Sequence, residues 1–284
     1  MSVKGMLKGA RQAIRRMPVL APLLNRRPVR FRLQRWPGAF LFYGRGWELL
    51  HPYDFENDTD TSGFVLPEES DNNSVTPGRN NPYAGSQPSI IREALKTIPG
   101  LETFTFIDLG CGKGRPLLVA SEFPFRRLIG VELSSPLAQV AQENVDRMLR
   151  RHPERSPVQI ENCDATTFAF PSGNLVVFLY NPFGQEVIRR VIANLEQALA
   201  TPERSVFVVY YNPVCGACLD ACPALERYFS KSIPYAEEER GFGPDDADAV
   251  VAWQGGTSLP ALSGADARID VIRPGERAEI SARV

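Results

Sequence analysis

The fold of this chain is decided by residues 103–132, which read TFTFIDLGCGKGRPLLVASEFPFRRLIGVE. The apolar run Phe104–Leu109 predicts a strand that is buried on both faces of a parallel sheet. A helix over Pro116–Ser121 and a second strand over Arg127–Leu133 complete a strand–turn–helix–strand unit. Ligands of open α/β sheets bind outside the carboxyl ends of such strands, beside a helix N-terminus.

The turn between the first strand and the helix carries glycine at positions 110, 112 and 114. Glycine lets the backbone turn tightly and lie close to a ligand, because no Cβ intervenes. The dinucleotide fingerprint G-x-G-x-x-G would need a further glycine at position 115, which is Arg115. Asp108 stands near the end of the first strand, and Glu132 stands near the end of the second, where an acidic side chain can bind ribose hydroxyls.

This strand, the D-L-G-C-G-K-G turn and Glu132 resemble motif I of the class I S-adenosylmethionine (SAM) dependent methyltransferases. The resemblance implies that SAM crosses the carboxyl ends of the strands, with its ribose at Glu132 and its adenine at Asp164. It also implies that a segment ahead of motif I folds over the methionine end of SAM, for which Tyr83, Ser86 and Gln87 are the candidates. The cofactor-binding residues predicted in this way are Asp108, Leu109, Gly110, Cys111, Gly112, Gly114, Glu132, Asp164, Ala165, Tyr83 and Ser86.

The substrate side of the site is predicted at Asn181-Pro182-Phe183, directly after the apolar strand Asn174–Tyr180. These three residues, the predicted catalytic group, resemble the (D/N)PP(Y/F) motif of methyltransferases that act on planar amino groups, although the second proline is absent. Together with the segment YAGS at 83–86, the stretch VFLYNPFG is also loosely similar to the DOT-type, non-SET lysine methyltransferases. No general base stands out, which suits transfer to nitrogen better than transfer to an unactivated hydroxyl.

The function expected from this resemblance is SAM-dependent methyl transfer to an amine nitrogen. Protein lysine is the favoured acceptor, and a nucleic-acid base or a small-molecule amine remains open. Two other classes stay as alternatives. One is an NAD-binding oxidoreductase, and the other is a SAM-binding or membrane-associated module without catalysis.

Apolar strands alternate with helices along the rest of the chain, which predicts an α/β fold. We expect a doubly wound, mostly parallel Rossmann-like sheet with a closing antiparallel hairpin within residues 231–254. The sequence divides into a basic N-terminal extension (1–47), a loop-rich lid and helix (48–102), the SAM-binding domain (103–254) and a C-terminal tail (255–284). The further helices and strands expected are Pro136–Arg151, Pro157–Glu161, Gln185–Leu199 and Ser205–Tyr211, and Ser89 is the expected N-cap of a helix ending at Leu95.

The charge of the chain is unevenly distributed. Residues 1–47 hold eleven Lys or Arg and no Asp or Glu, whereas the remainder holds 21 basic and 33 acidic residues. Residues 3–17 predict an amphipathic basic helix, which could lie on an anionic membrane, bind nucleic acid, act as an organelle transit peptide, or pack on its own domain. We expect a cytoplasmic location, with peripheral membrane attachment or organelle import as alternatives.

Cysteine and histidine usage argues against a metal site. The chain has five cysteines and two histidines, with no HExxH pair. Cys215, Cys218 and Cys222 resemble the last three cysteines of a ferredoxin run, but Asn212 occupies the first position. Their spacing of 3 and 4 suits a buried helix face, which is the preferred interpretation. The aromatic residues within 31–55 are similarly interpreted as an apolar cap of the core rather than a base-stacking surface.

Overall fold

The computed structural model describes residues 20–36, 38–39, 43–67, 81–200, 204–256, 259–262, 264, 269–273 and 276–280. The amphipathic helix predicted over residues 3–17 lies outside these ranges.

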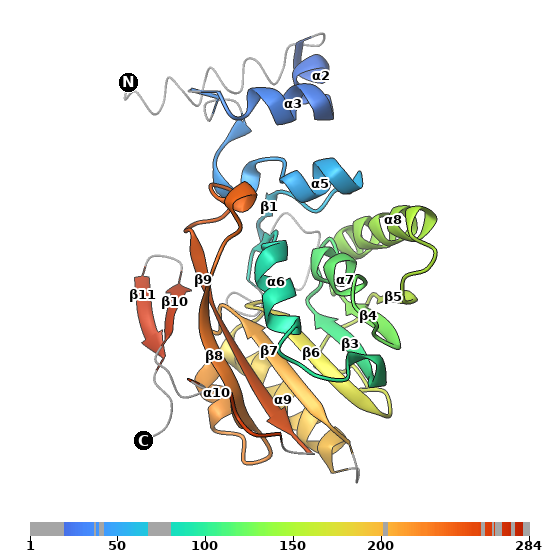
Figure 1. Cartoon of the computed structure of the whole chain (residues 1–284), viewed down its shortest axis with the longest axis vertical. Coiled ribbons are helices and arrows are strands. Elements are labelled where there is room, and N and C mark those ends of the chain that lie inside the picture. Colours follow the sequence, from blue (N-terminus) through green and yellow to red (C-terminus); the bar gives the residue numbers. More distant parts are fainter. Residues whose placement is uncertain are drawn as a thin grey trace.

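A seven-stranded sheet forms the centre of the molecule, in the order β5-β4-β3-β6-β7-β9-β8 (Figure 1). The pairs from β5 to β7 are parallel, and β9 runs antiparallel to both of its neighbours. The predicted doubly wound, mostly parallel sheet with an antiparallel hairpin is therefore confirmed. The strands span β3 Phe104–Leu109, β4 Arg127–Val131, β5 Val158–Glu161, β6 Asn174–Tyr180, β7 Val206–Tyr211, β8 Glu226–Pro234 and β9 Ala247–Gly255.

The closing hairpin starts earlier than the predicted residue 231. Its first strand begins at Glu226, because Tyr228 and Phe229 are buried in the core and extend the pairing with β9. A register shift between Arg227 and Phe229 accommodates this extension.

Helices cover both faces of the sheet, as the alternation of apolar strands and amphipathic helices requires. One face packs against α6, α7 and α8 in a core that includes Ile90, Leu117 and Val145. The other face packs against α9 and α10 through residues such as Val191 and Leu219. These helices span α6 Pro88–Leu95, α7 Arg115–Ala120, α8 Ser135–Arg151, α9 Gln185–Leu199 and α10 Gly216–Asp220.

The chain ahead of α6 crosses the end of the sheet at which the parallel strands finish (Figure 1). We call residues 51–67 the N-terminal strap and residues 81–87 the lid segment. The two are joined by a short antiparallel pair in which Phe64 lies opposite Ala84. The elements of this region are α2 Leu20–Asn25, α3 Arg27–Leu33, the 3-10 turn η1 Gly46–Glu48, α5 Pro52–Asn57, β1 Phe64–Val65 and β2 Tyr83–Ala84.

The tail contains a hairpin that the sequence did not reveal, with Ile269–Arg273 (β10) paired to Glu276–Ile280 (β11). It lies beside β8 and β9 in Figure 1. In the part of the chain that the structure describes, no helix has the length and apolar character needed to cross a membrane.

The N-terminus of α6 differs from the prediction. Ser89 is not its N-cap, because the helix begins at Pro88 and Gln87 occupies the cap position, although the Gln87 side chain forms no capping hydrogen bond. The Ser89 N–H instead donates to Glu239 Oε1 at 2.9 Å, and the Ser89 hydroxyl donates to the same carboxylate. Glu239 belongs to a 3-10 turn (η4, Glu237–Glu239) between β8 and β9, so a distant carboxylate satisfies this helix end.

Candidate functional site

A cavity of about 450 Å³ opens at the carboxyl ends of β3, β4 and β6. The strand order reverses between β3 and β6, and such a switch point is where open α/β sheets bind their ligands. The volume lies within the usual range for small-molecule sites. Its lining brings together most of the predicted residues, namely Tyr83, Ser86, Asp108, Gly110, Cys111, Gly112, Glu132, Ala165, Asn181, Pro182 and Phe183.

The turn after β3 requires glycine at two positions that face the cavity. Gly110 and Gly112 have φ angles of +77° and +54°, in the left-handed region that favours glycine. A Cβ added to Gly110 would lie 2.6 Å from the Cβ of Pro182, and one added to Gly112 would overlap the ring of Tyr83. The structure thus places the glycine turn in direct contact with both the Asn-Pro-Phe segment and the lid segment.

Glu132 holds the glycine turn in place. Its carboxylate accepts hydrogen bonds from the N–H groups of Gly112 and Ser134, both at 2.8 Å. Burial raises the pKa of Glu132, and the hydrogen bonds from Ser134 and Gly112 act in the opposite direction. Glu132, the predicted ribose contact, lines the cavity, and it also fixes the turn, a role that the sequence did not reveal.

Asp108 is a buried acid whose second carboxylate oxygen, Oδ2, has no hydrogen-bond partner. Burial, and then the negative charge of Glu132, raise the pKa of Asp108 well above its usual range. The Ser86 hydroxyl in the same cavity is also buried without a hydrogen-bond partner. Such groups are costly unless a ligand satisfies them, and two acids favour a ligand with positive charge.

Two residues of the glycine motif lie away from the cavity. Leu109 is fully buried in the core, among the residues that face α9. Gly114 is the N-cap of α7, and a Cβ there would lie 3.3 Å from the Cβ of Ala141 on α8. Both were predicted to bind the cofactor, and the structure instead gives them packing positions.

The predicted adenine contact at Asp164 also lies outside the lining. Asp164 Oδ1 accepts hydrogen bonds from the backbone N–H and the hydroxyl of Thr166, at 2.8 and 2.7 Å. Its neighbours Cys163 and Ala165 line the cavity instead. A short polar residue at a turn often binds its own backbone in this way, which is why the side chain turns from the cavity.

The lid segment lies over the glycine turn, with one correction to its predicted residues. Tyr83 covers Gly112, and its hydroxyl donates to the Thr61 carbonyl at 2.6 Å. Gln87 does not line the cavity, because its side chain is fully buried and its Oε1 lies 2.9 Å from His51 Nε2. Gln87 therefore joins the lid segment to the N-terminal strap.

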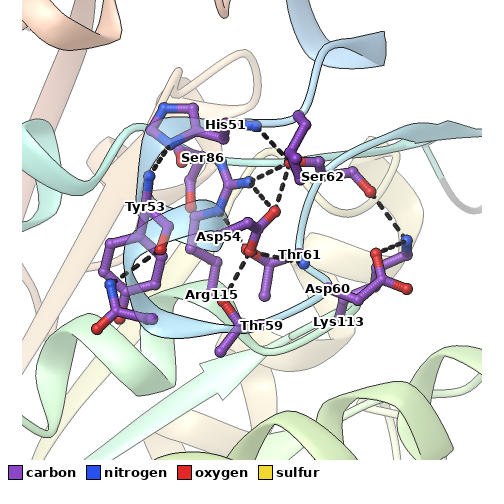
Figure 2. Close-up of polar contacts among 12 residues, drawn as sticks. His51, Tyr53, Asp54, Thr59, Asp60, Thr61, Ser62, Ser86, Lys113 and Arg115 are labelled. Carbon is purple, nitrogen blue, oxygen red and sulfur yellow. Dashed lines mark hydrogen bonds and ion pairs between the residues drawn. The ribbon is translucent and has the colours of Figure 1, made fainter. Parts of the chain in front are cut away.

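Arg115 anchors the N-terminal strap beside the cavity (Figure 2). Its guanidinium forms an ion pair with Asp54 at 3.3 Å, and the two side chains are 2% and 0% exposed. It also donates to Thr61 Oγ1 at 2.6 Å and to the Ser86 carbonyl at 2.8 Å. Arg115 thereby joins the first turn of α7 to both the strap and the lid segment.

Asp54 completes this network from the strap. Its carboxylate accepts hydrogen bonds from the hydroxyls of Thr59, Thr61 and Ser62 and from the Thr61 N–H. Burial by itself would raise the pKa of Asp54, but Arg115 and the three hydroxyls outweigh burial and lower it. This network was not predicted from the sequence. The feature that could have indicated it is Arg115 itself, because a dinucleotide-binding site has its third glycine at this position.

The predicted catalytic segment is held from two sides. Asn181 has a φ of +40°, an uncommon conformation for a residue other than glycine and one that clusters at functional sites. Its side-chain oxygen accepts a hydrogen bond from the Tyr210 hydroxyl at 3.3 Å. Asn81 donates to the backbone carbonyls of both Asn181 and Pro182, at 2.7 and 3.0 Å.

Aromatic side chains that the sequence did not assign to the site form part of its wall. Trp47, Phe64 and Tyr180 line the cavity, and the rings of Trp47 and Phe64 stack with centroids 5.9 Å apart. The expectation of an aromatic cap holds only in part, because Tyr43 and Tyr53 are buried whereas Trp36 is 70% exposed. Phe40 and Phe42 lie outside the described residues.

The three cysteines near α10 pack on one side of the sheet. Cys222 is buried and donates to Glu196 Oε1 at 3.2 Å, and Cys215 and Cys218 pack against the same core. Within the described ranges, no group of three His, Cys, Asp or Glu side chains is arranged to hold a metal ion.

Part of this chain is similar in sequence to a known methyltransferase. No protein-family model matches the chain. The histone-lysine N-methyltransferase, H3 lysine-79 specific, of Dictyostelium discoideum is 30% identical over 115 residues. The match covers 37% of this chain and 6% of that protein, so the chain spans a small fraction of the relative's length.

The chain has the fold of the class I methyltransferases. The predicted resemblance is supported by the strand order, by the residues at the switch point and by the local match to a lysine methyltransferase. This fold does not by itself decide the function of the chain.

Solved structures overlap the chain weakly. TrmN from Thermus thermophilus is 16% identical with a TM-score of 0.43, and covers 59% of this chain and 48% of its own. The ribosomal protein L11 methylase from Lactobacillus delbrueckii subsp. bulgaricus is 12% identical with a TM-score of 0.42, and covers 64% and 84%. Similarity at this level says nothing about the reaction.

The residues of this cavity fit SAM better than a dinucleotide. The N–H groups of Gly110 and Cys111 both donate to the Val131 carbonyl, and that of Gly112 donates to Glu132. These N–H groups are therefore not free to cradle a pyrophosphate. The acids Asp108 and Glu132 would repel its negative charge, but they suit the ammonium and sulfonium groups of SAM.

Proposed function

We propose that this protein is a SAM-dependent methyltransferase that transfers a methyl group to an amine nitrogen, most favourably that of a protein lysine. The observation that carries the proposal is Asp108, a buried acid with an unpartnered oxygen, beside Glu132 in a cavity at the switch point of the sheet. Asp108 and the glycine turn would hold the methionine part of SAM, and Glu132 would hold its ribose. The adenine would meet the segment of Cys163 and Ala165.

Bound SAM supplies an electrophilic methyl group, so the protein mainly positions the acceptor and excludes water. Asn181 is suited to orient an amine, because its side-chain oxygen can accept an N–H bond and the Tyr210 hydroxyl fixes the amide. Phe183 and Tyr180 bring apolar surface to the same part of the cavity. An amine attacks only in its neutral form, and apolar surroundings disfavour the charged form.

The favoured acceptor follows from the site and from the relative. The relative's name describes a methyltransferase specific for lysine 79 of histone H3. The cavity of this chain has an aromatic wall of Trp47, Phe64 and Tyr180, which can contact the alkyl stem and cationic end of a lysine. A nucleic-acid base and a small-molecule amine are the other acceptors to test.

Cofactor choice is tested by thermal unfolding with SAM, with S-adenosylhomocysteine and with NAD. A ligand at a hundred times its Kd stabilises by about 2.7 kcal/mol, which raises the melting temperature by several degrees. We expect a rise with SAM and its product and none with NAD. A rise with NAD alone would support the oxidoreductase alternative instead.

Acceptor choice is tested by methyl transfer from radiolabelled SAM to core histones, to transfer RNA and to spermidine. We expect the strongest labelling on protein lysine. Asn181→Ala should retain the thermal shift with SAM while losing labelling at least tenfold. A wild-type protein that binds SAM but labels none of a broad acceptor panel would favour the non-catalytic alternative.

A further inference from the structure

Three tyrosines and a buried acid form a cluster beside the cavity, on the face of the sheet that packs against α6. Asp248 lies near the start of β9 and is 4% exposed. Its Oδ2 accepts hydrogen bonds from the hydroxyls of Tyr211 and Tyr235, at 2.7 and 2.5 Å. Nothing in the cofactor site described above uses this carboxylate.

The cluster reaches the cavity through Tyr180. The rings of Tyr180 and Tyr211 have centroids 4.3 Å apart, and their hydroxyls interact. Tyr180 lines the cavity and directly precedes Asn181. Successive side chains of a strand point to opposite faces, so Tyr210 binds Asn181 from one face while Tyr211 binds Asp248 on the other.

The groups around Asp248 leave it able to gain and lose a proton. Burial raises the pKa of Asp248 to about 6, the hydroxyls of Tyr235 and Tyr211 lower it, and the nearby charge of Asp245 raises it further. Burial holds the pKa of Tyr180 and of Tyr211 far above its usual range, although Arg115 lowers that of Tyr180. The tyrosines therefore stay protonated, and they can pass a proton only by accepting one while donating another.

We propose that Asp248, acting through Tyr211 and Tyr180, accepts the proton that an acceptor ammonium group must lose before methyl transfer. An N–H bond of the ammonium breaks and its electron pair remains on nitrogen. The Tyr180 oxygen takes this proton while the Tyr180 hydroxyl proton passes to Tyr211, and the Tyr211 proton passes to Asp248. The neutral amine would then attack the electrophilic methyl group that bound SAM supplies, and the electron pair of the broken carbon–sulfur bond would remain on sulfur.

This inference rests on the proposed function, and it supplies the proton acceptor that the sequence did not reveal. Asp248 is a positioning residue in this scheme, since it acts on the acceptor through the tyrosines. After methyl transfer, Asp248 returns its proton to solvent, so the scheme consumes no further reactant.

The test is the pH profile of kcat from pH 6 to pH 10, with butylamine as a probe that mimics a lysine side chain. Asp248→Asn should lower kcat by about 100-fold near pH 7, a usual size for lost proton transfer. The deficit should shrink towards pH 10, because the amine, with a pKa of about 10.4, then loses its proton to solvent. Tyr211→Phe should behave in the same way.

The matched control is Tyr228→Phe, which removes a hydroxyl that donates to the Thr97 carbonyl at 2.8 Å, away from the cavity. It should leave the profile unchanged. If Asp248→Asn lowers kcat by the same factor at every pH, Asp248 has a merely structural role and the proposal is overturned.

A second measurement does not depend on turnover. In protein labelled with ¹³C at the aspartate carboxyl carbons, one signal should titrate near pH 6 and be missing from Asp248→Asn. An Asp248 signal that titrates below pH 4.5 would overturn the proposal. The rise in melting temperature with SAM should be the same for Asp248→Asn as for the wild type. If the wild type itself showed no rise with SAM, the proposed function would be overturned.

Discussion

Two buried acids near the cavity differ in how their charge is satisfied. Asp54 in the N-terminal strap forms an ion pair with Arg115 and accepts hydrogen bonds from three hydroxyl groups. These partners lower the pKa of Asp54. Asp108 at the end of β3 keeps an unpartnered oxygen, and its pKa is raised well above the usual range by burial and by Glu132. Both side chains are almost completely excluded from solvent.

This difference separates a structural site from a ligand site. The charge of Asp54 is balanced within the protein, so the strap stabilises the folded state without a ligand. The Asp108 carboxyl is not balanced, so it costs stability until a cationic group arrives. Charge balance therefore distinguishes the two regions better than burial or polarity does.

The largest expected effect comes from unbalancing the strap. Arg115→Met leaves Asp54 buried without its cation and should lower the free energy of unfolding by about 3–5 kcal/mol. Urea unfolding at pH 7 measures the change. The contribution of ionised Asp54 to the free energy of unfolding is fully present above the usual aspartate pKa. It should be lost as the pH drops through the lowered pKa of Asp54 in the folded state.

The control for this variant is Arg92→Met, which breaks an ion pair with Glu122 whose side chains are 37% and 25% exposed. Its cost should be about 1 kcal/mol or less. Equal costs for the two variants would mean that the Arg115 pair is no more important than a surface pair.

The next effect tests the contact between the glycine turn and the lid segment. Gly112→Val places a branched side chain on the Tyr83 ring at a φ of +54°, so SAM affinity should fall by more than about 100-fold. Calorimetric titration with S-adenosylhomocysteine measures the loss. Gly100→Val, at a φ of +68° with open space around it, is the matched control and should leave affinity unchanged.

A smaller effect should follow from removing the unbalanced charge. Asp108→Asn should weaken SAM binding by about 1.5–3 kcal/mol, the usual range for hydrogen bonds to charged groups. Wild-type binding should release a proton, because the cation lowers the raised pKa of Asp108, and affinity should therefore increase with pH. Calorimetry in buffers of different ionisation enthalpy measures this release.

Asp108→Asn should abolish that proton release without lowering the melting temperature of the free protein. Proton release of the same size in wild type and variant would show that Asp108 is not the group that meets the cation.

The smallest effect on the cofactor is expected from the N-terminal arm. Deletion of residues 1–19 should change SAM affinity by less than about twofold, because the strap is anchored by Arg115 and by Arg27, which donates to the Asp54 and Thr59 carbonyls. The same deletion should reduce attachment to anionic vesicles or to nucleic acid, as tested by co-sedimentation at low and high salt. If attachment is unchanged, the arm is a solvated extension.

The parts of the fold that follow from local sequence were predictable. The buried strand Phe104–Leu109, the glycine turn and Glu132 lie close together in the chain, and their periodicity and turn chemistry predict the structure. The acid at the end of a strand and the Asn-Pro-Phe segment could be placed at one edge of the sheet, because the ends of parallel strands meet there.

The remaining features depend on contacts between distant residues. Asp54 and Arg115 are 61 positions apart, and Ser89 and Glu239 are 150 apart, so no local pattern identifies either pair. Side-chain direction was a second limit, because Asp164 turns towards Thr166 and Gln87 towards His51. The cluster at Asp248 joins three strands and was invisible for both reasons.

The place of Arg115 has a consequence for protein engineering. Replacing Arg115 with glycine would complete the dinucleotide fingerprint in the sequence. However, the Arg115 guanidinium also fills the space beside Gly85, where an added Cβ would lie 2.6 Å from the guanidinium. The exchange would detach the strap and the lid segment together. A redesign of cofactor choice in this scaffold must therefore first provide another cationic partner for Asp54, and Arg115 can be replaced by glycine only afterwards.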